Sequence, residues 1–229
     1  MRPRGFTLVE LLVVTVIIAA LAGLSTPVIM QQKKKAALAA ATSNAKQIGY
    51  GLFEFDAQFG ALPDNHTAEA VAALAGSGHN LSGNQSNDYF RQLLVAGIGT
   101  EEIFFAKTPY TRQPDNASSG GKALAAGEVG FGYIMRDATT GLSSSGNPAQ
   151  TVVAAPLLDA RNDWSFDPGP YGDKAVVLRL DQSVQQVPIR QTDQRAIVGG
   201  GWPLEQTGED TAWGDRIQPV LKAPGKLGN

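Results

Sequence analysis

The chain has 229 residues, with 19 lysines and arginines against 21 aspartates and glutamates and a formal net charge of −2. This near balance excludes a broadly basic nucleic-acid-binding protein. The sequence contains two histidines and no cysteine. Disulfides, cysteine-based zinc sites, thiol nucleophiles and lipid attachment to cysteine are therefore excluded.

The charges are distributed unevenly along the chain. Residues 1–35 carry a net charge of +4, because Arg2, Arg4 and three lysines outweigh Glu10, whereas residues 36–229 carry −6. A short basic, apolar front followed by an acidic body is typical of a membrane segment that carries a water-soluble domain.

Twenty residues without a charge, Leu11–Met30, follow the basic start of the chain. As a helix they would span about 30 Å, the thickness of the hydrocarbon core of a bilayer. Three interpretations fit this segment. It is a secretory signal cleaved after the small-x-small sequence Ala20–Ala22, or a plain membrane anchor, or an anchor that also mediates assembly.

Glu10 stands directly before this apolar run and favours the third interpretation. A carboxylate near the centre of a membrane helix costs about 2.5–3.5 kcal/mol, and less toward the interface. A signal or a plain anchor has no use for this cost, whereas a cation on a neighbouring molecule would offset it. The simpler alternative is that Glu10 lies solvated among the lipid headgroups.

The residues around Glu10 form a specific motif. Residues 5–14 read Gly-Phe-Thr-Leu-Val-Glu-Leu-Leu-Val-Val and follow a short basic leader, and Pro27 lies further along the apolar run. This segment resembles the processing site of type IV pilins and type II secretion pseudopilins. Many of these proteins have a helix-interrupting proline at the place of Pro27.

The resemblance implies a processing and assembly pathway. Prepilin peptidase would remove the leader, residues 1–5, by cleaving after Gly5, and the new N-terminal residue, Phe6, would be N-methylated. Glu10 would then face the α-amino group of Phe6 in a neighbouring subunit. The chain would be a single-pass protein of the bacterial inner membrane with a periplasmic head, and would later join a periplasmic or cell-surface filament.

The resemblance also implies the partners. They are prepilin peptidase, further copies of this chain, other pilins or pseudopilins, the inner-membrane assembly platform and, before assembly, membrane lipid. No nucleic acid is expected as a partner.

A single long helix is predicted from Phe6 to Phe59. Small and apolar residues recur at steps of three and four and mark one helix face: Leu38, Ala41, Ala45, Ile48, Leu52, Phe55 and Phe59. Gly60 and Pro63 end the helix, and Pro27 interrupts it.

The helix divides the chain into parts with different surroundings. We expect residues 6–30 to form its transmembrane and assembly half and residues 31–62 its amphipathic half. Residues 63–229 are expected to form a globular head domain on which the second half packs.

Short helices are predicted in the first part of the head domain. The first covers Thr67–Leu74. The second covers Asp88–Val95, with Asn87 as its N-cap and Gly97 after its end. The third covers Glu101–Phe105, with Thr100 as its N-cap.

Strands are predicted in the second part, over residues 131–136, 151–155, 174–180 and 183–187. The last two form a hairpin that turns at Asp181 and Gln182 and resembles the late hairpin of large pilin-like proteins from planctomycetes and verrucomicrobia. The tail after Ile189 is expected to cover the sheet in irregular conformation. The predicted fold is therefore α+β and pilin-like, with a long N-terminal helix and a C-terminal antiparallel β-sheet.

The motifs of common enzymes are missing from the sequence. It contains no His-Glu-x-x-His zinc motif and no Gly-x-Ser-x-Gly nucleophile elbow. Gly120-Gly121-Lys122 lacks the further residues of a phosphate-binding loop, and the glycines at 127, 130 and 132 precede a strand rather than a helix. We expect no catalytic residue and no cofactor.

One acidic series offers weak metal ligands. Asp159, Asp163, Asp167 and Asp173 carry oxygens that suit calcium. Their spacing matches neither an EF-hand nor the late calcium loop of some major pseudopilins. Turn formation and solvation explain these aspartates more simply.

The sequence therefore predicts a non-enzymatic structural subunit of a type IV pilus-like filament, assembled through its N-terminal helix. One alternative is a minor pseudopilin of a type II secretion or DNA-uptake system. The second is a secreted periplasmic binding or enzymatic domain whose signal peptide is removed.

Overall fold

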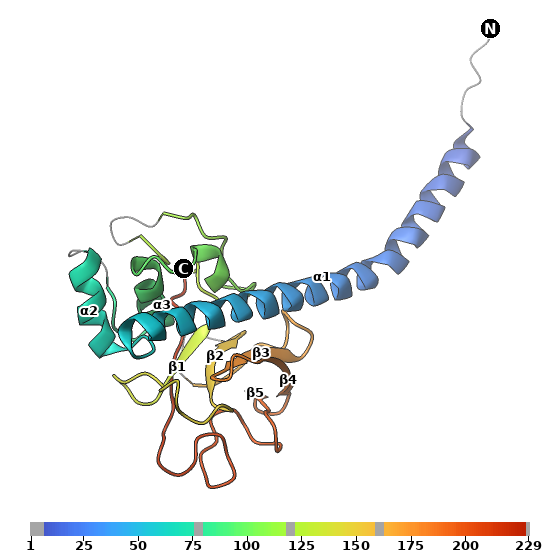
Figure 1. Cartoon of the computed structure of the whole chain (residues 1–229). Helices are drawn as coiled ribbons and strands as arrows, with labels where there is room; N and C mark the ends of the chain where they lie inside the picture. Colours follow the sequence, from blue (N-terminus) through green and yellow to red (C-terminus); the bar gives the residue numbers. More distant parts are fainter. Residues whose placement is uncertain (1–6, 76–79, 118–121, 159–162, 228–229) are drawn as a thin grey trace.

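The computed structural model describes residues 7–75, 80–117, 122–158 and 163–227. A long helix, α1 (Leu8–Phe59), lies with its C-terminal part on a head domain and extends away from it with its N-terminal part (Figure 1). The head begins with two α-helices, α2 (Asn65–Ala75) and α3 (Ser86–Val95), and the 3-10 helix η1 (Glu101–Phe104).

The rest of the head is a six-stranded antiparallel sheet in the order β5-β4-β3-β2-β1-β6. Its strands are β1 (Gly132–Met135), β2 (Thr151–Ala155), β3 (Lys174–Arg179), β4 (Val184–Arg190), β5 (Arg195–Ala196) and β6 (Val220–Lys222). The predicted α+β class is confirmed, as is the hairpin of β3 and β4, in which Leu178 pairs with Val184 across the predicted turn.

The expectation of an irregular tail is wrong in part. The tail supplies β5 and β6, and β6 pairs with β1, so that Leu221 lies opposite Ile134 at the far edge of the sheet. A strand of three residues between Pro219 and Pro224 is too short for an alternating pattern to reveal it. Trp213, in the irregular stretch between β5 and β6, is buried and donates a hydrogen bond from Nε1 to the Leu204 carbonyl (2.6 Å).

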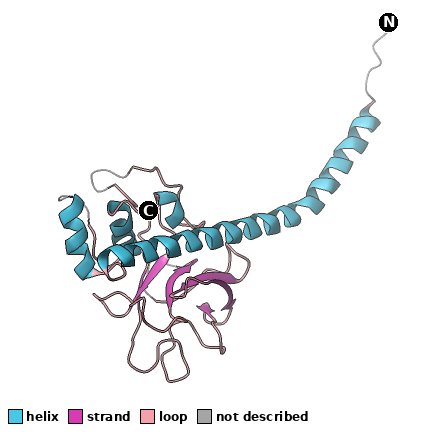
Figure 2. Cartoon of the chain, in the orientation of Figure 1, coloured by secondary structure: helices cyan, strands magenta, loops and turns pink. Residues whose placement is uncertain are grey.

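The C-terminal part of α1 crosses the sheet (Figure 2). Its predicted apolar face is the buried one, with Phe59 half-buried at its end and these residues buried: Leu38, Ala41, Ala45, Ile48, Leu52 and Phe55. Two polar side chains fix the helix in place. Asn44 donates to the Phe105 carbonyl after η1 (2.9 Å), and Lys46 donates to the Gln182 carbonyl in the β3–β4 turn (2.8 Å).

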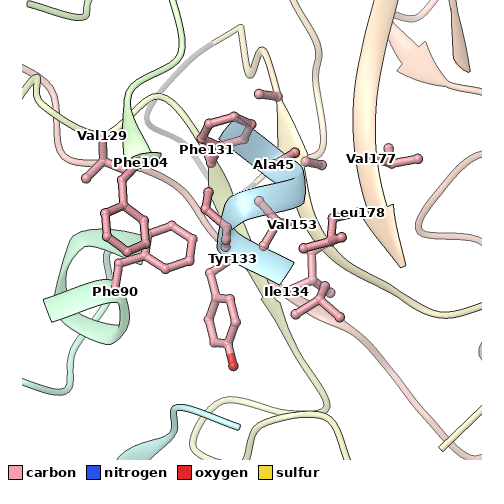
Figure 3. Packing of buried hydrophobic residues seen from close by; sticks show 14 of the residues in the cluster. Ala45, Phe90, Phe104, Val129, Phe131, Tyr133, Ile134, Val153, Val177 and Leu178 are labelled. Carbon is pink, nitrogen blue, oxygen red and sulfur yellow. The ribbon is translucent and has the colours of Figure 1, made fainter. Parts of the chain in front are cut away.

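Aromatic rings join the helices to the sheet beneath α1. The Phe90 ring of α3 stacks on that of Phe104 in η1 at 4.8 Å and meets Tyr133 of β1 edge-on at 5.5 Å (Figure 3). Tyr133 also donates its hydroxyl hydrogen to the Pro63 carbonyl (2.9 Å), directly after the end of α1. These contacts fix the position of η1 against β1.

Two predicted caps differ in the structure. Asn87 lies inside α3 rather than at its N-cap, which is Gln85, and its buried amide bonds across to the Leu124 carbonyl and the Gly225 N–H (2.8 and 2.7 Å). Thr100 is the N-cap of η1, but its side chain makes no capping bond, and η1 is a 3-10 helix. Asparagine side chains favour local hydrogen bonds to the backbone at a helix N-terminus, but Asn87 bonds instead to residues that are distant in the sequence.

Gly130 marks the closest approach of two backbones in the head. Its N–H donates to the Phe104 carbonyl (3.0 Å), and a Cβ added to it would lie 2.3 Å from the Ala106 carbonyl oxygen. Only glycine fits there without a backbone shift, which gives a structural reason for one of the glycines before β1.

We therefore predict that Gly130→Ala destabilises the chain by about 1–3 kcal/mol, the usual cost of overpacking a site that cannot yield. Denaturant unfolding of the full chain in detergent, followed by circular dichroism, measures this change. The control is Gly23→Ala, because a Cβ there meets nothing within 4 Å. Equal stability of the two variants would contradict the prediction.

Candidate functional site

The N-terminal part of α1 presents an apolar surface to its surroundings. Large apolar side chains here are 46–80% exposed: Leu8, Val9, Leu11, Leu12, Val13, Val14, Val16, Ile17, Ile18, Leu21, Val28, Ile29 and Met30. Burial in α1 begins only at Ala37. Four consecutive apolar residues, 11–14, point to all sides of a helix, so the whole circumference needs an apolar environment.

This part of α1 meets the requirements of a membrane span. By length and composition it can cross a membrane, and none of its most apolar 18-residue window is buried in the structure. Lys33, Lys34 and Lys35 follow the span on the side of the head, and each is exposed. The apolar surface thus ends in positive charge before α1 reaches the head domain.

A capping box fixes the start of the helix. Thr7 is the N-cap, and its Oγ1 accepts a hydrogen bond from the Glu10 N–H (3.3 Å). In return, Glu10 Oε2 accepts hydrogen bonds from the Thr7 N–H (2.9 Å) and hydroxyl (2.7 Å). Both bonds use Oε2, so neither engages the second carboxylate oxygen, Oε1, of this exposed side chain.

The capping box was visible in the sequence but was not predicted. The spacing Thr-x-x-Glu before an apolar run is its known signature. From the sequence, Glu10 was interpreted only as a charge within lipid, and its additional role in capping the start of the helix was not predicted. The predicted processing residues, Gly5 and Phe6, lie outside the described residues, and the predicted pairing of Glu10 with a neighbouring amine stays a prediction.

Pro27 lies inside α1 and does not end it. A proline lacks the N–H that would bond the carbonyl four residues earlier and forces the helix to bend or break. Figure 1 shows α1 bent between its free N-terminal part and the part that lies on the sheet. We attribute this bend to Pro27; because α1 continues through it, the structure has a bend there and not the predicted helix break.

The described aspartates of the series considered for calcium, Asp163, Asp167 and Asp173, accept hydrogen bonds from other groups of the chain. Asp163 Oδ1 accepts from the Ser165 N–H (3.0 Å), and Asp167 Oδ1 accepts from the Gly169 N–H (2.8 Å). Asp173 Oδ1 accepts from the Gln191 side chain (2.7 Å). Among the described residues these three do not bring their carboxylates together as a ligand group. Asp159 lies outside the described residues, so calcium at this series stays a prediction.

Comparison with known proteins bears on the N-terminal segment. Residues 1–26 match the family model described as the prokaryotic N-terminal methylation motif. The search of curated proteins and the search of solved structures each returned no match. The matched segment contains Gly5, Phe6, Thr7 and Glu10 and most of the exposed apolar surface of α1.

Proposed function

We propose, from the premise that this chain is a type IV pilin-like or pseudopilin-like protein, that it is a structural subunit of a pilus-like filament. Prepilin peptidase cleaves it after Gly5, Phe6 is N-methylated, and subunits assemble through their N-terminal helices. Before assembly the subunit is held in the inner membrane by the apolar part of α1, with its head in the periplasm. The role is structural and involves no catalysis.

The observation that carries this proposal is the exposed apolar surface of α1 joined to a stable head. A surface that is apolar on all sides is covered either by lipid or by equivalent helices of neighbouring subunits. The methylation motif lies at the free end of the same helix. Transfer from lipid to a bundle of such helices keeps this surface out of water throughout assembly.

The capping box supports a second role for Glu10 in register. Because Oε2 takes both bonds from Thr7, the other carboxylate oxygen is left for the amine of Phe6 in the next subunit. Pairing neutralises a charge that is costly within an apolar bundle. Since the pair forms at one stagger of the two helices only, it sets the axial position of each added subunit.

Cleavage after Ala22 would remove Glu10 and most of residues 1–26, the segment that matches the methylation motif. The alternative of a secreted domain therefore leaves that match unexplained. The minor pseudopilin stays the main alternative, and the share of this chain in purified filaments separates the two.

Processing is tested by the N-terminus of the mature protein. We predict that mass spectrometry of native protein finds N-methylphenylalanine at Phe6, and that Gly5→Asp leaves residues 1–5 attached, because the peptidase requires glycine before the cut. A mature chain that begins at Gly23 would instead identify a secreted protein.

Assembly is tested by separating the charge of Glu10 from its capping role. Glu10→Gln keeps an oxygen that accepts from Thr7 but removes the charge, whereas Thr7→Ala removes the capping hydroxyl and keeps the carboxylate. We predict that Glu10→Gln is processed normally but reduces filaments in sheared-cell fractions at least tenfold, and that Thr7→Ala retains most of them.

The matched variant decides between the two roles of Glu10. If Thr7→Ala lost filaments as completely as Glu10→Gln, the helix start rather than the ion pair would limit assembly. Normal filaments from Glu10→Gln would remove the pairing role altogether.

A further inference from the structure

Three carboxylates from separate segments of the head come together. Glu101 belongs to η1, Asp115 lies in the loop that follows η1, and Glu128 lies in the segment directly before β1. One oxygen of each lies within 4.8 Å of the other two. Glu101 and Glu128 are 2% and 0% exposed, whereas Asp115 is exposed. Two buried carboxylates beside a third are costly unless something neutralises them.

The hydrogen bonds of the group leave two buried oxygens without a partner, Glu101 Oε2 and Glu128 Oε1, of which only the second faces a cation, Arg112. Glu101 Oε1 accepts from the Leu124 N–H (3.0 Å), but its second oxygen, Oε2, is buried and has no hydrogen-bond partner. Glu128 Oε2 accepts from the Ala125 N–H (2.7 Å), and Asp115 Oδ1 accepts from the Ala117 N–H (2.9 Å). A buried oxygen without a partner is costly, and an ion, an ordered water or a proton can satisfy it.

Among the described residues, one cation is paired with the group. Arg112 Nη2 lies 3.1 Å from Glu128 Oε1. Three ionised carboxylates against this one arginine have a formal charge of −2. Burial is the main cause that raises the pKa of Glu128; Asp115 and Glu101 raise it further, whereas the Ala125 N–H and Arg112 lower it.

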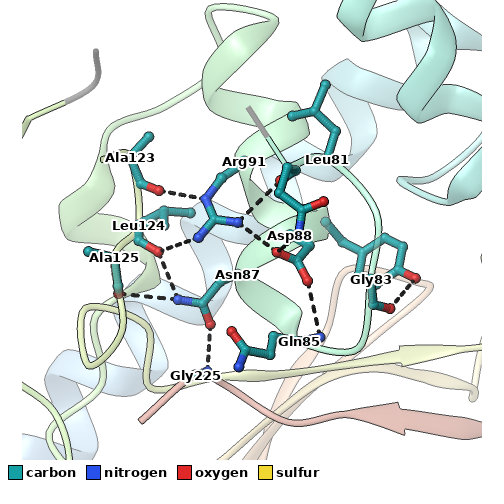
Figure 4. Close-up of polar contacts among 12 residues, drawn as sticks. Leu81, Gly83, Gln85, Asn87, Asp88, Arg91, Ala123, Leu124, Ala125 and Gly225 are labelled. Atoms are coloured by element: carbon teal, nitrogen blue, oxygen red, sulfur yellow. Dashed lines mark hydrogen bonds and ion pairs between the residues drawn. The ribbon is translucent and has the colours of Figure 1, made fainter. Parts of the chain in front are cut away.

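The backbone that holds these glutamates is fixed from its other side. Arg91 of α3 donates to the Ala123 and Leu124 carbonyls (2.6 and 3.0 Å), and Asn87 donates to the Leu124 carbonyl (Figure 4). Arg91 is itself held by Asp88 at 2.6 Å. The N–H groups of residues 124 and 125 are therefore held toward Glu101 and Glu128, which preorganises the two carboxylates.

We propose that Glu101, Asp115 and Glu128 bind one calcium ion. Calcium prefers oxygen ligands at about 2.4 Å, so that two ligands on opposite sides of the ion are about 4.8 Å apart. The group supplies oxygens within that limit and an oxygen of Glu101 without a hydrogen-bond partner. A divalent ion would cancel the formal charge of −2 that the group has when its three carboxylates are ionised. The exposed Asp115 gives the ion access from solvent, and water completes its coordination.

The competing occupant is a proton shared between the two buried glutamates. A proton would satisfy Glu101 Oε2 without any metal. Either a calcium ion or a proton would relieve the repulsion between the carboxylates. The two can be told apart, because only calcium binding makes the stability of the chain depend on the calcium concentration at constant pH.

The test uses the full chain in detergent, stripped with EDTA and titrated with CaCl₂ at pH 7.5. Calorimetry is expected to detect one site with a Kd of about 10⁻⁴–10⁻³ M, the range of extracellular calcium modules. Calcium at 100 times the Kd should raise the melting temperature by about 5–10 °C.

Glu101→Gln, whose side-chain oxygen can still accept the hydrogen bond from the Leu124 N–H, should abolish the calcium response. In EDTA it should melt at a higher temperature than the wild type. Asp115→Asn should weaken binding at least tenfold.

The matched control is Asp137→Asn. Asp137 is also an exposed aspartate whose Oδ1 caps a turn, accepting from the Thr139 and Thr140 N–H groups (2.9 and 2.8 Å), but it lies outside the group. It should retain the full calcium response. A wild type that shows no calcium response, or a response that persists in both Glu101→Gln and Asp115→Asn, overturns the proposal. In the first case, a melting temperature that rises more steeply in the wild type than in Glu101→Gln as the pH is lowered would identify the shared proton.

Discussion

The apolar surface of α1 from Leu8 to Met30 is exposed in the single chain, and the organisation of the molecule follows from the need to cover it. Water would penalise this surface by roughly 25 cal/mol for each Å². Lipid is proposed to cover it in the monomer, and neighbouring helices in a filament. Burial of apolar surface is not directional, so it does not fix the axial offset between neighbouring helices. A charge at a single position can supply what apolar packing lacks, and we propose that Glu10 is that charge.

The second half of α1 connects this assembly surface to the head. The same helix that is exposed before Ala37 becomes part of the hydrophobic core after it, with Ile48 and Phe55 fully buried. Asn44 and Lys46 add hydrogen bonds to η1 and to the β3–β4 turn. The head therefore cannot rotate about α1 without breaking its own core. The orientation of α1 in an assembly fixes the orientation of the head that the assembly displays.

The sequence predicted those features that depend on local pattern. The buried face of α1, its end at Gly60, and the β3–β4 hairpin all follow from periodicity and turn residues, and the structure confirms them. Features that depend on distant partners were missed. Asn87 bonds to Leu124 and Gly225 instead of capping its helix. Residues 220–222 form strand β6 by pairing with the free edge of β1, which is distant in the sequence.

The sites divide in the same way. The motif around Glu10 is contiguous, and therefore it was recognisable, although its capping box with Thr7 was overlooked. The acidic group of Glu101, Asp115 and Glu128 joins three segments that only the fold of the head brings together. No spacing in the sequence marks it. The aspartates that lie close together in the sequence, Asp163 and Asp167, accept from nearby backbone N–H groups instead.

The most direct test of the central claim is covalent capture of the contact between subunits. Filaments assembled from a mixture of ¹⁵N-labelled and unlabelled chains are treated with dicyclohexylcarbodiimide, which enters apolar regions and joins a carboxylate to an adjacent amine. Peptide mass spectrometry is predicted to find an amide bond between Glu10 of one chain and the N-terminal Phe6 of a differently labelled chain. Cross-links between the heads without this bond, or a bond formed only within single chains, would contradict the account.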